Sequence, residues 1–178
     1  AAACYAHDVL DAAPNSVIRG VINGVIAEHY EFDVRATRAE VMTRLAPHVR
    51  EAVRYAKKEA ESVTGSWTRE PRIRFSHVGE IVAFPNFANA VAQEIITHSS
   101  GQVVPVIYTR HPNARQLNPQ LWVTNFTLDK SSLSRRSWAP ATSRLVFSAF
   151  GGEISDDVEV NFLEHHRWSH LTPVGNGT

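Results

Sequence analysis

Hydrophobic residues recur at helical spacing in the first third of the chain. Val21 and Val25 belong to a three- and four-residue apolar repeat within 14–30, which predicts a helix. A second helix is predicted over 37–63, where Pro47 should kink or restart it, because proline has no N–H to give and crowds the preceding turn. The predicted buried stripe of this second helix consists of Val41, Leu45, Val49, Val53, Ala56 and Ala60.

Short strands alternate with helices and turns in the rest of the chain. Strands are predicted at about 73–78, 103–109, 121–127, 144–149 and 158–163, with a helix over 86–98 between the first two. Because helical crossovers separate most of these strands, they should be mutually parallel. The link before the last strand is too short for a helix, so that pair could be antiparallel. The pattern predicts one α/β domain over 1–178, either a partial (β/α) barrel or an open parallel sheet flanked by helices.

Both ends of the sequence read as cut. The chain opens on AAACYAHD without an initiator Met and closes on the turn-like TPVGNGT. The first two predicted helices also look like the crossover from a strand lying before Ala1. We therefore expect the domain to lack segments at both ends.

Composition and charge narrow the class of protein. Of the 178 residues, 43% are hydrophobic and 20% are charged, as in soluble globular proteins. The 18 basic and 18 acidic side chains cancel, so no net field attracts nucleic acid or an anionic membrane. No apolar run is long enough to span a bilayer. The single cysteine excludes an internal disulfide and fits a reducing compartment, so we expect a cytoplasmic protein. A nucleic-acid role is disfavoured, and its patch would be Arg135, Arg136, Trp138 and Arg144.

Polar side chains follow or end each predicted strand. Chemistry in parallel α/β sheets and barrels gathers beyond the carboxyl ends of the strands, because the loops converge there. The predicted rim therefore binds a small polar substrate, and its catalytic candidates are His77, Glu80, Arg110 and Glu153.

The same residues also fit a purely structural role. Asn, Asp, Ser and Thr in strand-to-helix loops often only cap the next helix, and we favour capping for Asn86 and Asp129. For His77 with Glu80 the site and the turn remain equal alternatives. The same holds for Glu164 and His165, because ion pairs gather in such loops as well.

The segment FLEHHRWSH offers metal ligands. Glu164 and His165 combine a carboxylate with an imidazole, which suits zinc, iron or manganese. The spacing matches no specific zinc signature, so these two residues are predicted ligands of an unidentified divalent metal.

Several short motifs, taken in order, resemble a known family. Cys4-Tyr5-Ala6, Pro14-Asn15, RFSHVGE and VIYTR are similar to segments of uncharacterised mycobacteriophage proteins known only as a numbered gene product. The likeness covers most of the chain. It implies a phage origin without naming an activity.

The order of elements also resembles the partial barrel of radical S-adenosylmethionine enzymes. In that family a cysteine-rich loop follows the first strand, and a Gly-Gly-Glu turn after the second holds the amino group of the cofactor. The resemblance implies that Cys4 ends the cysteine loop and that Gly79 and Glu80 stand for the turn. Asn125 and Asn161 complete the predicted cofactor-binding set. An iron–sulfur cluster needs several thiolates and this sequence has one, so a cluster would require a longer protein.

Two hypotheses of different class follow. The first is a (β/α)-barrel enzyme that binds a polar substrate at the carboxyl rim of its strands, with a metal or iron–sulfur cofactor. The second is a non-enzymatic structural or binding protein of phage origin, whose polar rim only caps helices.

Overall fold

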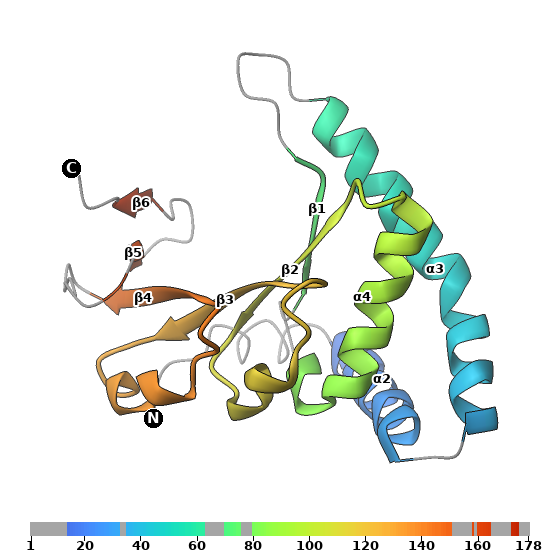
Figure 1. Ribbon diagram of the computed structural model, residues 1–178, viewed down its shortest axis with the longest axis horizontal. Coiled ribbons are helices and arrows are strands. Elements are labelled where there is room, and N and C mark those ends of the chain that lie inside the picture. The colour runs from blue at the N-terminus through green and yellow to red at the C-terminus, as the bar shows by residue number, and fades with distance from the viewer. Residues whose placement is uncertain are drawn as a thin grey trace.

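The computed structural model describes residues 14–32, 35–62, 70–75, 80–150, 158, 160–164 and 172–174. Two long helices come first and a sheet follows (Figure 1). The helices are α2 (Pro14–Phe32), α3 (Arg35–Glu61) and α4 (Pro85–Ser99), with the short 3-10 helices η1 (Ile81–Ala83), η2 (Pro112–Gln116) and η3 (Leu133–Trp138). The strands are β1 (Arg72–Phe75), β2 (Val104–Thr109), β3 (Val123–Leu128), β4 (Arg144–Phe150), β5 (Val160–Glu164) and β6 (Thr172–Val174).

The strands form one sheet in chain order, β1-β2-β3-β4-β5-β6. Strands β1 to β5 are mutually parallel, and β6 pairs with β5 in the antiparallel sense. The predicted α/β fold with a parallel sheet is therefore confirmed. The pair that could have been antiparallel, β4 with β5, is parallel. Among the described strands, β1 and β6 do not pair, so the sheet is open there.

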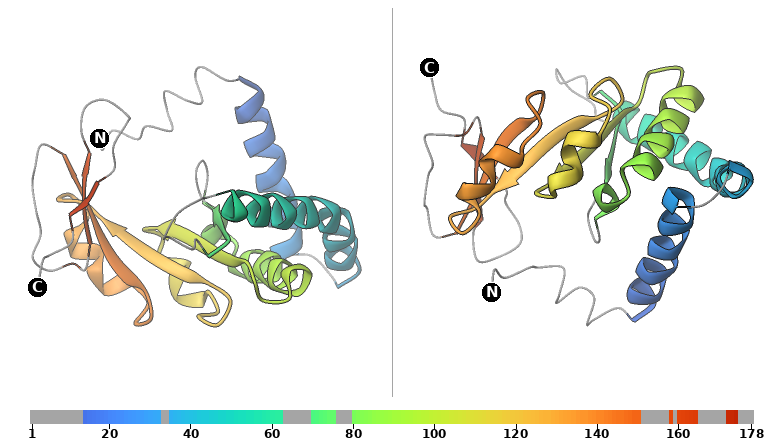
Figure 2. Two further views of the ribbon diagram at one scale, coloured as in Figure 1. Left: turned by 90° about the horizontal axis from the view of Figure 1, so that it is seen from above. Right: turned by 60° about the horizontal axis from the view of Figure 1, so that its bottom comes forward.

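The helices that follow β1, β2 and β3 cover the same face of the sheet. In Figure 2, α4 in yellow-green, η2 in yellow and η3 in orange lie on one side of the strands. Their side chains share one apolar cluster with alternate strand residues, including Ala88 and Ala92 of α4, Ala114 of η2, Ile107 of β2, Phe126 and Leu128 of β3 and Phe147 of β4. We call this side of the sheet the covered face. Consecutive strands joined by crossovers on one side are wound in a single direction, as in a (β/α) barrel.

Helix α3 packs on the outer side of α4. Its Val49, Val53 and Ala56 are buried together with Val91 and Ile95 of α4, as the apolar repeat predicts. The predicted restart at Pro47 is wrong, because α3 runs unbroken from Arg35 to Glu61. The lost hydrogen bond at Pro47 costs stability. The burial of the stripe just beyond Pro47 offsets that cost and keeps both halves in one helix.

The amino end of α4 is capped from a distant helix. The carboxylate of Glu31 in α2 accepts hydrogen bonds from the backbone N–H of Phe87 at 3.1 Å and from the Asn86 amide at 2.9 Å. The N-cap position is Phe84, which makes no side-chain capping bond, and Pro85 starts the helix. The predicted capping by Asn86 is therefore wrong. A negative charge from α2 takes its place, which the positive end of the helix dipole favours.

No described helix is long and apolar enough to cross a membrane.

Candidate functional site

The register of the parallel strands shows which side chains share the other face of the sheet. Tyr108 of β2 lies opposite Asn125 of β3, which lies opposite Arg144 of β4. Opposed residues in a sheet point to the same side, and residues two apart on a strand do so as well. Those three positions alternate with Ile107, Phe126 and the other residues of the covered face, so they point away from α4. We call this side the polar face, and its polar residues are Arg74, Tyr108, Asn125, Thr127 and Arg144.

One cation–π contact and several buried side chains characterise the polar face. The guanidinium of Arg74 lies 4.4 Å from the centre of the Tyr108 ring, a cation–π contact between neighbouring strands. Asn125 is only 4% exposed. Val106 and Val146, on the same side of the sheet, are buried.

An ion pair lies at the carboxyl ends of β2 and β3. Arg110 Nη1 donates to Asp129 Oδ2 at 2.6 Å. The other oxygen of Asp129 accepts hydrogen bonds from Ser131 Oγ at 2.6 Å and Ser132 Oγ at 2.8 Å. Burial alone would raise the pKa of Asp129, but the hydrogen bonds of Ser131, Ser132 and Arg110, with the positive charge of Arg110, lower that pKa to about 2. Asp129 is therefore a permanent anion that holds the guanidinium in place.

This pair places Arg110 where a ligand can reach it. The side chain of Arg110 is 41% exposed, whereas that of Asp129 is 13% exposed. A guanidinium has five N–H donors in a planar fork, so one short bond to Asp129 leaves other donors available. The predicted capping of η3 by Asp129 is wrong, because Ser132 occupies the N-cap position. Asp129 closes the turn before η3 and binds Arg110.

Glu80 has a different role from Arg110. Glu80 Oε2 accepts a hydrogen bond from Thr109 Oγ1 at 2.9 Å, and Glu80 Oε1 accepts a longer one from Val82 N at 3.4 Å. Glu80 is the N-cap of η1. Thr109 Oγ1 in turn accepts from His111 N at 2.9 Å. The carboxylate thus ties the start of η1 to the end of β2, as expected for a side chain that organises a turn.

The described residues bring together only part of the predicted site. Glu80 and Arg110 follow neighbouring strands and Asn125 lies in the next one, but their side chains have separate partners. Asn161 and Glu164 lie in β5, opposite Phe147 and Phe150. The remaining candidates, Cys4, His77, Gly79, Glu153 and His165, lie outside the described residues.

Sequence reasoning missed three residues of the polar face as site candidates. Arg74, Tyr108 and Arg144 lie within or at the start of strands. The candidates predicted from the sequence lie mainly at or after the ends of strands, so these three residues are not among them. A signal was present in RIRF, where arginines alternate with apolar residues, because this period predicts one polar and one buried side. The sequence places Arg144 only in the disfavoured nucleic-acid patch.

A metal fits poorly to the residues described. Within the described ranges, no three His, Cys, Asp or Glu side chains converge as metal ligands would. Glu164 contributes only its backbone to the described chain, and His165 and Cys4 lie outside it. The chemistry below is therefore derived without a metal or cluster.

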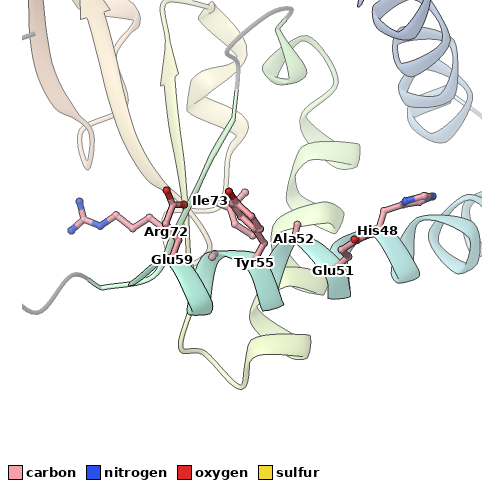
Figure 3. A pocket seen from close by; sticks show the side chains of 8 residues that line it. His48, Glu51, Ala52, Tyr55, Glu59, Arg72 and Ile73 are labelled. Atoms are coloured by element: carbon pink, nitrogen blue, oxygen red, sulfur yellow. The ribbon is translucent and has the colours of Figure 1, made fainter. Parts of the chain in front are cut away.

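A shallow hollow of about 480 Å³ lies between α3 and β1 (Figure 3). Tyr55 is exposed at its centre and points toward Ile73, while Glu51 and Glu59 flank it along α3. Arg72 borders the hollow but pairs with Glu70 at 3.1 Å. The hollow lies beside the outer strand of the sheet and contains none of the predicted site residues, so we place the candidate site at the carboxyl ends of β2 and β3, around Arg110. The residues that line the hollow are His48, Glu51, Ala52, Tyr55, Ala56, Glu59, Arg72 and Ile73.

Comparison of the chain with protein-family models, with curated proteins and with solved structures gives no match.

Proposed function

We propose that this protein is an enzyme of the (β/α)-barrel type, with a small, polar, anionic substrate bound at the carboxyl ends of its parallel strands. The crossovers from β1 to β4 on one face, and the parallel pairing of β4 with β5, support this architecture. In sheets of this kind, loops after successive strands surround the substrate.

The observation that carries the proposal is the fixed, partly exposed guanidinium of Arg110. Asp129 fixes Arg110 at 2.6 Å, and the low pKa of Asp129 keeps this anchor charged. A cation held in place loses little side-chain entropy when it binds an anion, which favours binding. Arginine also suits carboxylate and phosphate groups, because its N–H fork matches two of their oxygens.

The chain's own residues would position the substrate in three ways. Arg110 would take its anionic group, and Asp129 would keep the guanidinium oriented. Glu80 and Thr109 would hold the start of η1 against the end of β2 through their 2.9 Å bond. A metal or iron–sulfur cofactor belongs to the same proposal, but no step is assigned to it. Acid–base groups at the predicted rim are His77 and Glu153.

The test is a thermal-shift screen with a panel of small phosphate and carboxylate metabolites, followed by mass spectrometry of each compound that binds. A ligand at 100 times its Kd stabilises the fold by about 2.7 kcal/mol, which corresponds to roughly 5–10 °C in Tm for a chain of this size. We expect at least one compound to raise Tm and to be consumed. Arg110→Gln should lose both effects, and Arg115→Gln, an exposed arginine of η2, should keep both.

Two results would count against the proposal. If no compound of the panel shifts Tm, the protein has no anion site of the proposed kind. Equal shifts in wild type and Arg110→Gln would show that the anion binds elsewhere.

An exposed apolar stripe on α2 supports the second function, that of a non-enzymatic binding protein. Ile22, Val25, Ile26 and Phe32 are exposed at helical spacing. Exposed apolar patches of this kind mark protein contacts more often than catalytic sites. Binding without consumption in the screen would favour this alternative.

A further inference from the structure

The outer edge of strand β1 presents backbone groups that no described strand pairs with. Strand β1 is the last strand on its side of the sheet, and among the described strands it bonds only to β2. Val104 N donates to Pro71 O at 2.9 Å, which fixes the alternation of the parallel ladder, so Ile73 also bonds to β2. The N–H and C=O groups of Arg72 and Arg74 therefore point away from β2. An extended chain is the kind of partner that such a row of donors and acceptors fits.

The hollow of about 480 Å³ lies along this edge, between β1 and α3 (Figure 3). Tyr55 is 67% exposed and points toward Ile73, and Ala52 and Ala56, which have small side chains, line the hollow beside it. Ile73 lies on the covered face and packs with residues of α3 and α4. A side chain next to Ile73 on an added strand would therefore enter the hollow and contact the Tyr55 ring. The hollow favours an apolar side chain of moderate size, such as valine or isoleucine.

The two residues that flank Ile73 on β1 indicate the charge of the partner. Arg72 and Arg74 alternate with Ile73, so they lie on the polar face, and both are exposed. Arg72 pairs with Glu70 at 3.1 Å, but both side chains are more than half exposed, so this ion pair is weak and can exchange. The Arg74 guanidinium lies 4.4 Å from the centre of the Tyr108 ring, which holds it close to the sheet. Opposite charges on neighbouring strands attract, so the partner strand should carry an acidic residue on each side of its apolar one.

The same arginines argue against a second copy of this chain on the edge. If two β1 strands paired about a two-fold axis with Ile73 opposite Ile73, Arg72 of one copy would lie opposite Arg74 of the other. Like charges directly opposite each other destabilise a pair of strands. The edge therefore selects a chain of different sequence.

We propose that the edge of β1 and the hollow beside it bind an extended peptide segment of another protein, in which an apolar residue stands between two acidic residues. The segment adds a strand to the sheet. Its backbone pairs with Arg72 and Arg74, its apolar side chain enters the hollow below Tyr55, and its two carboxylates face the arginines. This surface is separate from Arg110 at the carboxyl ends of β2 and β3, so its test is independent of the test of the proposed function.

The probe is a short synthetic peptide in which glutamate and valine alternate, and its binding is measured by fluorescence anisotropy. We expect saturable binding to wild type, and at least about fivefold weaker binding of a peptide with lysine in place of glutamate. Two further peptides carry N-methyl groups, one on every valine and the other on every glutamate. Only alternate N–H groups of an added strand face β1, so one of these two peptides should lose binding. Methylated valines block a parallel strand, and methylated glutamates block an antiparallel one.

Protein variants locate the binding surface. Tyr55→Ala removes the ring at the hollow and should weaken binding of the glutamate peptide about two- to tenfold. Because Tyr55 is exposed, this variant should fold as wild type does. Arg74→Glu should also weaken binding of the glutamate peptide and should strengthen binding of the lysine peptide. Arg50→Glu is the matched control: Arg50 is an exposed arginine of α3 that does not line the hollow, so both affinities should stay as in wild type.

Each outcome supports or overturns the proposal. Loss of binding in only one of the N-methylated peptides, together with the effect of Tyr55→Ala, supports it. No binding of the glutamate peptide to wild type overturns it, and Arg72 and Arg74 are then charges that protect an edge strand from aggregation. Equal affinity of the two N-methylated peptides excludes strand addition and overturns it as well. A wild-type dimer that the peptide does not dissociate shows a second copy on the edge, which overturns the choice of partner.

Discussion

The two faces of the same strands differ sharply in chemistry. On β3, Phe126 is fully buried on the covered face, while its neighbour Asn125 is a buried amide on the polar face. On β2, Ile107 and Tyr108 alternate in the same way. The covered face gains stability from apolar area removed from water. The polar face keeps groups that a stable core would replace, which points to a function rather than to folding.

The difference also separates two kinds of residue at the strand ends. Glu80 and Thr109 bind each other and the start of η1, so their bonds organise the fold. Arg110 and Asp129 bind each other too, but the guanidinium stays partly exposed. A substitution in the first pair should therefore change stability. A substitution of Arg110 should mainly change binding.

The largest effect is expected from Phe126→Ala on the covered face. Phe126 is 0% exposed, and truncation of a buried phenylalanine typically costs about 3–5 kcal/mol of unfolding free energy. Thr127→Ala, one residue along and on the polar face, should cost less than about 1 kcal/mol. Urea denaturation of both variants measures the difference. Similar losses in both would show that the two faces are packed alike.

A smaller effect is expected from Asp129→Asn, and it depends on pH. The folded-state pKa of Asp129 is about 2, below its ordinary value of 3.8, so its charge stabilises the folded state above pH 3.8 and this stability is lost as the pH falls toward 2. After allowance for partial solvent screening, Asp129→Asn should cost about 1–2 kcal/mol at pH 7. The two proteins should become equally stable near pH 2.

Denaturation at pH 7, 4 and 2 checks this prediction. Glu40→Gln is the control, because Glu40 forms an exposed ion pair with Arg44 and should contribute little. A constant difference between wild type and Asp129→Asn at all three pH values would mean that the serine bonds, not the charge, stabilise the turn.

Much of this fold could be predicted from the sequence. The β-branched run of Val103 to Tyr108 and the alternation of strands with crossovers predict parallel pairing, and the structure confirms it. Strand β6 is not predicted from the sequence. Its three residues, Thr172–Val174, include a proline and are too few to show the alternation of a strand. Local signals thus suffice where a strand is long and its neighbours are joined by helices.

The site was harder to predict, because its contacts join distant parts of the chain. Arg110 was named from its place after a strand, but its partner Asp129 was assigned only a capping role. The row of Tyr108, Asn125 and Arg144 depends on register and on which face the helices cover. Neither can be obtained from one strand alone. A sequence shows that RIRF has two sides, and the winding of the chain decides which side is buried.

The smallest effect is expected at the amino end of α4, where a contact from the distant helix α2 replaces the local cap expected from Asn86. Glu31 accepts three hydrogen bonds, from the Asn86 side-chain amide at 2.9 Å, from Phe87 N at 3.1 Å and from Asn86 N at 3.4 Å, and these residues lie 55 and 56 positions further along the chain. Glu31→Gln keeps the size of the side chain but removes the charge that the helix dipole favours, so we expect a loss of about 0.5–1 kcal/mol. Glu28→Gln, an exposed neighbour on α2, should change stability by less than about 0.5 kcal/mol. Urea denaturation in low and high salt separates the charge–dipole contribution of Glu31 from its hydrogen bonds. Salt screens the interaction of the Glu31 charge with the helix dipole, whereas the hydrogen bonds stay in place. Equal losses of unfolding free energy in Glu31→Gln and Glu28→Gln would contradict this prediction. The packing of α2 on α4 would then depend on Ala27 and Tyr30 and not on the Glu31 cap.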